Sequence, residues 1–251
     1  GKYVFDWQRY ENVIRLATRF LDNIIDVNKY PIEEIEIATK LTRRIGLGVM
    51  GLADLLFELN IPYNSYEGYE FMSRLAEALS YYSMDESVEI AKSRGVFPLY
   101  NESGYVNGEL PIAGYYESKH TLDWNALIDK IKRYGLRNSQ TTTVAPTGTI
   151  SMIADCSSGI EPLFALVFEK RVTVGSFFYT NKRFEEALKR YGLYSNELLV
   201  RISNNYGSIK GLDLPEELER VFVTAMDIHW TDHVIAQAIW QKWISNAIAK
   251  T

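Results

Sequence analysis

Apolar residues along this chain recur mostly with the period of a helix. Between Asp6 and Val27 they stand three and four positions apart, which predicts a helix with one apolar face. The same spacing returns along most of the chain, and proline or glycine marks several of the predicted ends. Helices are expected at Asp6–Val27, Gly51–Leu59, Ser65–Ser93, Thr121–Tyr134, Phe184–Tyr191, Asn196–Asn204 and Thr231–Ala249.

Strand signals are fewer and shorter, and segment 32–42 has a mixed pattern. Thr141–Ala145 is β-branched, Leu163–Val174 is rich in Phe and Val, and Ile45–Val49 is a short apolar run before a helix. Few strands among many helices, each strand leading into a helix, indicate an α/β fold with a central sheet or barrel. No long linker or repeat divides the chain, so residues 1–251 are expected to belong to one domain.

Charge and cysteine content exclude several classes of protein. The 32 acidic residues outnumber the 27 basic ones, for a net charge of −5, which argues against a general nucleic-acid-binding surface. Cys156 is the only cysteine, so neither an intrachain disulfide nor a Cys-rich zinc site can form. Segment Gly1–Arg9 is not a signal peptide, and no apolar run reaches the roughly 18–20 residues of a membrane span. The sequence therefore predicts a soluble, cytoplasmic protein with no membrane partner.

One glycine motif has the spacing of a dinucleotide-binding turn. Gly46–Gly51 reads Gly-Leu-Gly-Val-Met-Gly, and in such a turn the glycines let a pyrophosphate approach the start of a helix. The preceding residues 40–44 are polar, however, whereas this fold requires a buried strand there. Close packing of the turn against its neighbour is the simpler interpretation, and a nicotinamide site stays open as the alternative.

A second motif favours an anion site more strongly. Ala145–Ser151 reads Ala-Pro-Thr-Gly-Thr-Ile-Ser and follows a β-branched strand. Small hydroxyl residues and a glycine at the start of a helix offer unpaired backbone N–H groups and hydroxyl donors to a phosphate. Gly148 removes a side chain where the phosphate would come close. The alternative is a plain helix cap by Thr147 or Thr149.

Three further candidates have weaker patterns. Glu161, held extended before a proline, is either a site carboxylate or a turn residue. His229 and His233 share a helical spacing that can bind a metal, but Trp230 stands where a zinc protease needs Glu, so a structural role is expected and no metal is predicted. Cys156 has no neighbouring histidine in the sequence and is expected to be a small buried residue rather than a nucleophile.

Taken together, these motifs resemble the large, catalytic subunit of ribonucleotide reductase. The similarity covers nearly the whole chain, with the segments in the family's order. The residues of several motifs are most like those of the adenosylcobalamin-dependent class II. The segments that carry it are Phe20–Tyr30, Arg43–Leu56, Asn138–Ser151, Ser157–Pro162 and Gln237–Thr251.

The resemblance implies a fold and a role for the matching residues. The family fold is a ten-stranded α/β barrel of two parallel half-barrels, and this helix-rich chain would form the C-terminal part of it. In the family, main-chain amides and hydroxyls of the matching strand, loop and helix hold the substrate phosphates. The residues carried over are Ala145, Pro146, Thr147, Gly148, Thr149, Ile150 and Ser151. Gly46–Gly51 becomes a packing turn inside the barrel.

One departure from the family pattern limits what can be transferred. The family reaction needs a radical cysteine in an Asn-x-Cys-x-Glu motif and a further cysteine pair, and the sequence contains neither. Cys156 lies between Asp155 and Ser157, outside that motif, so no catalytic residue is assigned in this chain. We therefore expect an internal or split portion of the enzyme, lacking the upstream cysteine loop and the final strands, and inactive in isolation.

The complete enzyme implied by the resemblance converts ribonucleotides to 2′-deoxyribonucleotides by radical chemistry. It would use adenosylcobalamin, a ribonucleoside di- or triphosphate as substrate, a thioredoxin-like reductant, and the remaining part of the reductase as a partner, with a homodimer also open. Three alternatives stay: a class with a separate metal-containing radical subunit, a nicotinamide-dependent dehydrogenase using Gly46–Gly51, and a non-catalytic subunit that completes a split reductase.

Overall fold

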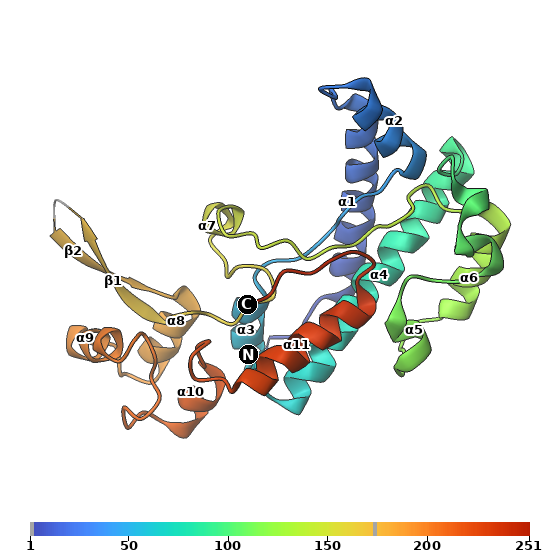
Figure 1. Cartoon of the computed structure of the whole chain (residues 1–251). Helices are drawn as coiled ribbons and strands as arrows, with labels where there is room; N and C mark the ends of the chain where they lie inside the picture. The colour runs from blue at the N-terminus through green and yellow to red at the C-terminus, as the bar shows by residue number, and fades with distance from the viewer. Residues whose placement is uncertain (1–2, 173–174) are drawn as a thin grey trace.

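A long central helix organises the molecule. The computed structural model describes residues 3–172 and 175–251, with the side chains of 170–177 excepted. Helix α4, Tyr66–Arg94, begins where the Ser65 hydroxyl accepts a hydrogen bond from the Gly68 N–H, and it buries residues on all its sides. Helices α1 (Trp7–Val27) and α11 (Trp230–Trp243) lie along it (Figure 1). The other elements are α2 (Glu33–Thr42), α3 (Leu52–Leu59), η1 (Tyr100–Glu102), η2 (Gly104–Asn107), α5 (Ala113–Glu117), α6 (Trp124–Tyr134), α7 (Ile150–Ala154), β1 (Val167–Val172), β2 (Gly175–Thr180), α8 (Lys182–Arg190), α9 (Asn196–Asn204) and α10 (Glu216–Val221).

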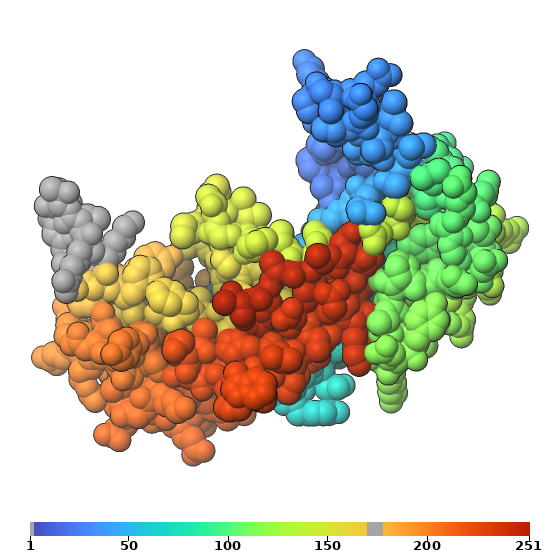
Figure 2. Space-filling view, viewed as in Figure 1, coloured from blue at the N-terminus to red at the C-terminus, as the bar shows by residue number. Residues whose placement is uncertain are grey.

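Two hydrophobic cores hold these elements together. The larger one surrounds α4, and in it the rings of Trp124 and Trp243 stack with centroids 5.8 Å apart. The smaller one joins β1 to α8, α9 and α10, and includes Phe184 and Ile202. Phe57 on α3 belongs to the smaller core while its neighbour Leu56 belongs to the larger one, so α3 connects the two. Figure 2 shows the α1–α2 end projecting from the rest of the molecule.

Three short extended segments pair in parallel beneath the candidate anion site. Segment 141–144 lies in the middle, bridged to one neighbour through Leu47↔Thr142 and to the other through Val144↔Ile248. The predicted strands at 45–49 and 141–145 are therefore present as short parallel segments. Among the described residues the regular sheet is the antiparallel pair β1–β2, and the parallel segments do not close into a barrel.

Several predicted boundaries change in the structure. The helix expected at Thr231–Ala249 ends at Trp243, and the residues after it are extended because the Ala249 N–H donates to the Val144 carbonyl at 2.8 Å. The strand expected at Leu163–Val174 begins only at Val167, and residues 173–174 lie outside the described residues. The mixed segment 32–42 forms α2, which buries none of its residues.

The predicted apolar face of α1 is covered only in part. Ile14 and Ile25 are buried, but Leu16 is 71% exposed and Phe20 is 61% exposed. Several apolar side chains of α2 are exposed as well. Both α1 and α2 therefore expose apolar side chains. No helix among those residues is both long enough and apolar enough to cross a membrane.

A buried charge cluster fixes the entry into the parallel segments. The Arg43 guanidinium donates to Asp22 Oδ1 at 2.8 Å and to Asp26 Oδ1 at 2.8 Å. The Asn138 amide donates to Asp22 Oδ1 and to the Arg43 carbonyl. Asp22 and Asn138 are fully buried, and Arg43 adopts a left-handed conformation with φ 45°. The end of α1 and the starts of two strands are thus joined by one network.

Candidate phosphate-binding site

The loop after segment 141–144 has a defined backbone path. Thr147 sits at φ 54°, a strained conformation for a β-branched residue that its surroundings must hold. Two hydrogen bonds do so: the Gly159 N–H donates to Thr147 Oγ1 at 2.7 Å, and the Ser151 N–H donates to the Thr147 carbonyl at 2.9 Å. These bonds tie the loop to the turn at Gly159 and to the start of helix α7.

Three consecutive backbone N–H groups of this loop are available to a ligand. No hydrogen bond within the described part of the chain takes up the N–H of Gly148, Thr149 or Ile150, and all three residues are exposed. Thr149 stands at the cap position but makes no side-chain cap bond, so the plain-cap alternative is not what the loop adopts. Because α7 has only five residues, its dipole contributes little, and anion binding would depend on the loop amides.

The hydroxyl groups of the motif take a different role from the one expected. Thr147 Oγ1 accepts from Gly159, and the buried Ser151 hydroxyl contacts the Gly148 carbonyl at 3.3 Å and the Ser158 hydroxyl at 2.9 Å. These two side chains support the loop from behind. The predicted residues with exposed positions at the loop are Ala145, Pro146, Gly148, Thr149 and Ile150.

A cavity of about 900 Å³ opens beside the loop. Gly148 and Met152 are among the residues that line it, and Phe164 and Phe168 contribute apolar surface. Two cations also reach it, but both have partners: Lys182 pairs with Asp155, and Arg183 Nε lies 2.9 Å from Glu58. A phosphate at this edge would therefore be held mainly by backbone N–H groups.

The glycines of the 46–51 motif face other parts of the chain. A Cβ on Gly46 would lie 2.7 Å from the Thr143 side chain, and one on Gly48 would lie 2.3 Å from the Thr143 carbonyl oxygen. Gly51, at φ 84°, lies against Cys156. These contacts support the packing interpretation, because the absent side chains make room for the neighbouring strand.

Cys156 is half-buried and lines the cavity, rather than being fully buried as expected, and the histidines at 229 and 233 make local hydrogen bonds. Burial, followed by the charges of Asp54 and Asp155, raises the pKa of the Cys156 thiol, so little nucleophilic thiolate forms at neutral pH. His229 caps α11 through a bond from the Thr231 N–H, while His233 contacts the Ala225 carbonyl. No group of metal-ligating side chains assembles among the described residues.

Glu161 has a partner that the sequence pattern did not indicate. It was expected to be either a site carboxylate or a turn residue, and it lines the cavity while pairing with Lys250 at 3.0 Å. The partner lies far along the chain, and no local motif links the two residues. Only the folding of 246–249 beside 141–144 brings them together.

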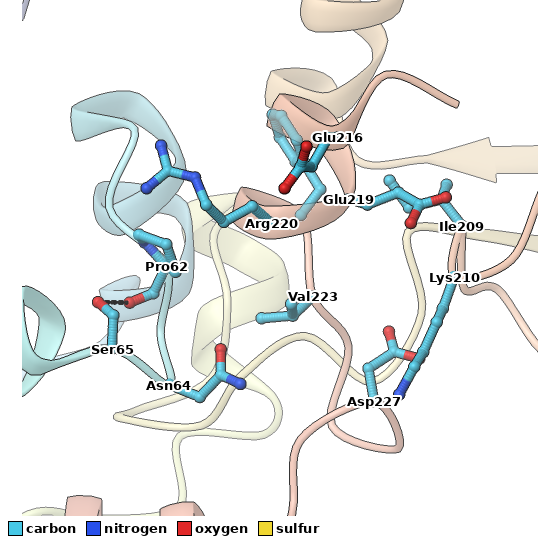
Figure 3. Close-up of a pocket in the computed structure, with 11 residues that line it drawn as sticks. Pro62, Asn64, Ser65, Ile209, Lys210, Glu216, Glu219, Arg220, Val223 and Asp227 are labelled. Atoms are coloured by element: carbon cyan, nitrogen blue, oxygen red, sulfur yellow. Dashed lines mark hydrogen bonds between the residues drawn. The ribbon is translucent and has the colours of Figure 1, made fainter. Parts of the chain in front are cut away.

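A second hollow of about 460 Å³ lies apart from the loop. Figure 3 shows Pro62 and Ser65, from the connection between α3 and α4, facing Arg220 and Glu216 of α10. Its lining combines acidic and basic side chains and contains no residue of the 145–151 motif. The two hollows are thus distinct features.

Comparison with known proteins identifies relatives over the whole chain. The family model for the ribonucleotide reductase barrel domain matches residues 1–251. A vitamin B12-dependent ribonucleoside-diphosphate reductase of Thermoplasma acidophilum is 40% identical, covering 100% of this chain and 29% of the relative. A protein of the same name from Mycobacterium tuberculosis is 37% identical over 98% of this chain and 32% of its own length. A ribonucleoside-diphosphate reductase subunit alpha of Chlamydia pneumoniae is 35% identical over 97% of this chain and 25% of its own length. The chain spans less than a third of each of these relatives.

Proposed function

The chain belongs to the ribonucleotide reductase family, within its barrel domain, and from this premise we propose that it supplies the substrate-phosphate-binding loop of such an enzyme. The observation that carries the proposal is the set of three unpaired N–H groups at residues 148–150, at the end of a parallel strand segment. All three relatives described above are named as reductases of ribonucleoside diphosphates, so a diphosphate is the anion we expect there. The remaining loop residues, 145–147 and 151, shape the site.

Phosphate binding at this loop would serve chemistry that takes place elsewhere on the substrate. In the complete enzyme the ribose 2′-hydroxyl is replaced by hydrogen, and binding energy from the phosphates positions the ribose for that step. The 251 residues contain no radical-cysteine motif, and a thioredoxin-like reductant has no cysteine pair here to act on. We therefore expect substrate binding but no turnover from these residues without the rest of the enzyme. A cytoplasmic location belongs to the same proposal.

Adenosylcobalamin is the cofactor that we propose for the complete enzyme, because two of the relatives carry a vitamin B12-dependent name. When bound, it would supply the initiating radical. Both nitrogens of His233 and Nδ1 of His229 already have hydrogen-bonding partners, and no group of metal-ligating side chains assembles among the described residues. We therefore assign no residue of this chain to the cofactor.

The exposed apolar surfaces support a partner within the same enzyme. Leu16 and Phe20 on α1, and Met152 and Ile153 on α7, are each more than half exposed. We propose that the remaining part of the ten-stranded barrel covers them, since large apolar patches of this kind mark interaction sites. Association with a chain that carries the cysteine loop would support this, whereas self-association into a homodimer would assign the surface to a second copy.

Equilibrium titration with a ribonucleoside diphosphate tests the proposed site. We expect saturable binding to the wild type, at least tenfold weaker binding to Gly148→Val, and a smaller loss for Thr149→Ala, whose backbone N–H is retained. Lys210→Met, which changes only the second hollow, is the matched control. Equal affinities of all four proteins would refute the site, and binding of NAD that is lost in Gly46→Ala would favour the dehydrogenase alternative.

A further inference from the structure

A buried lysine lies at the end of the third parallel segment. The Lys250 side chain is 0% exposed. Its Nζ is 3.0 Å from Glu161 Oε2, 2.9 Å from His233 Nδ1 and 2.9 Å from the Thr251 carbonyl oxygen. An ammonium group has three N–H donors, so these three acceptors satisfy it completely.

The hydrogen bonds around Lys250 indicate which nitrogen of His233 carries the proton and which carboxylate pairs with the lysine. His233 Nε2 lies 3.0 Å from the Ala225 carbonyl, which can only accept, so Nε2 carries the proton and Nδ1 accepts from Lys250. The second oxygen of Glu161 accepts the Thr251 N–H at 2.6 Å. Glu161 is thus the one side-chain carboxylate that the described residues place against the buried cation, and removing either charge would leave the other side chain without its ionic partner.

This ion pair joins two segments that hold the base of the phosphate loop. The Ala249 N–H donates to the Val144 carbonyl at 2.8 Å, so the lysine's segment is bonded to the strand that leads into the loop. Glu161 lies two residues after Gly159, whose N–H donates to Thr147 Oγ1 at 2.7 Å. The pair therefore connects the strand before the loop with the turn that supports the loop from behind.

We propose that Lys250 and Glu161 are positioning residues for phosphate binding. Their ion pair holds the turn at 157–161 against segment 246–249, and this keeps Thr147 in its left-handed conformation with the three free amides directed to one anion. The proposal rests on the proposed function of the loop. Neither side chain needs to contact the phosphate.

Binding and loop order in the same chain test the proposal. In Lys250→Met we expect at least tenfold weaker binding of ADP, while Lys242→Met, on the same terminal region but paired only with the exposed Glu117, should bind like the wild type. Glu161→Gln keeps the shape of the side chain and should also weaken binding, and it replaces Lys250→Met if that variant does not fold. Wild-type affinity in the folded charge variants would overturn the proposal.

Hydrogen exchange separates this proposal from the function on which it rests. The N–H groups of Gly159 and Ser151 both bond to Thr147, so they report the order of the loop without any ligand. We expect both to exchange at least tenfold faster in Lys250→Met, with amides of α4 unchanged. Unchanged exchange at both positions would overturn the positioning role even if ADP binds, whereas faster exchange in a protein that does not bind ADP would contradict the proposed function only.

Discussion

Replacing Gly48 by alanine should lower the stability of the protein, whereas the same replacement at Gly148 should not. Gly48 is enclosed by the neighbouring segment, and Gly148 faces open space. A Cβ on Gly48 would lie 2.3 Å from the Thr143 carbonyl oxygen, more than about 1 Å inside van der Waals contact, so the two strands would have to separate. A Cβ on Gly148 would have nothing within 4 Å, and its backbone is not left-handed.

The cost at Gly48 follows from the bonds that the separation would disturb. Three backbone hydrogen bonds join the segments, from Ile45 to Gln140, from Leu47 to Thr141, and from Thr143 to Leu47, at 2.8 to 3.0 Å. At about 1 kcal/mol each, their loss lowers the free energy of unfolding by about 3 kcal/mol. For a chain of this size that corresponds to a fall in Tm of about 6–12 °C.

Urea unfolding, monitored by tryptophan fluorescence, measures the free energy of unfolding of both variants, because Trp124, Trp240 and Trp243 are buried and should report the loss of the core. Gly148→Ala should unfold within about 1 kcal/mol of the wild type, since alanine there only restricts the unfolded chain. Its affinity for ADP should nevertheless fall, because the methyl group stands at the free amides. Equal stability of Gly48→Ala and the wild type would refute the packing role of the 46–51 motif.

Three further predictions follow from other contacts. Glu77→Ala should lower the free energy of unfolding by about 3–5 kcal/mol in urea titration, because the buried carboxylate accepts four hydrogen bonds from residues 121–124; a loss below about 1 kcal/mol would contradict this. Burial raises the pKa of Asp85, but hydrogen bonds from Lys130 and Arg15 outweigh this effect and hold the pKa below its usual range. The stability that Asp85 contributes to the fold is therefore complete above about pH 4, and it is lost as the pH falls through the pKa of Asp85 in the folded protein. Asp85→Asn should therefore flatten the loss of stability below pH 4, and an unchanged acid-unfolding profile would refute the assignment. Phe20→Glu should leave the free energy of unfolding within about 0.5 kcal/mol of the wild-type value, because the side chain is 61% exposed. The same substitution should weaken association with a chain carrying the cysteine loop in sedimentation experiments. Unaltered association would show that α1 is not part of the interface.

Local signals were sufficient for most helices. Helix α9 has the predicted bounds Asn196–Asn204 because its cap, Ser195, and its apolar period lie within the segment. The end of α11 was wrong because a non-local interaction decides it. Pairing with Val144, about a hundred residues earlier, draws 246–249 into an extended conformation, and no helical period contains that information.

The candidate site shows the same division between local and non-local information. The glycine and hydroxyl residues of 145–151 identified the loop, but residue types did not show that Thr147 and Ser151 are engaged by Gly159 and Ser158. The Lys250–Glu161 pair was missed for the same reason. Such partners are set by the tertiary fold, and a single sequence provides no pattern that connects them.

Amide chemical shifts of the loop test the central claim most directly. On titration of the ¹⁵N-labelled protein with ADP, we predict saturable shifts of the Gly148, Thr149 and Ile150 N–H resonances. Within the part of the chain that the structure describes, these three groups make no other hydrogen bond, and they would become donors to phosphate oxygens. Saturation of these three amides with one affinity would support the assignment of the loop as a phosphate site. ADP binding that shifts other amides and leaves these three unmoved would contradict it.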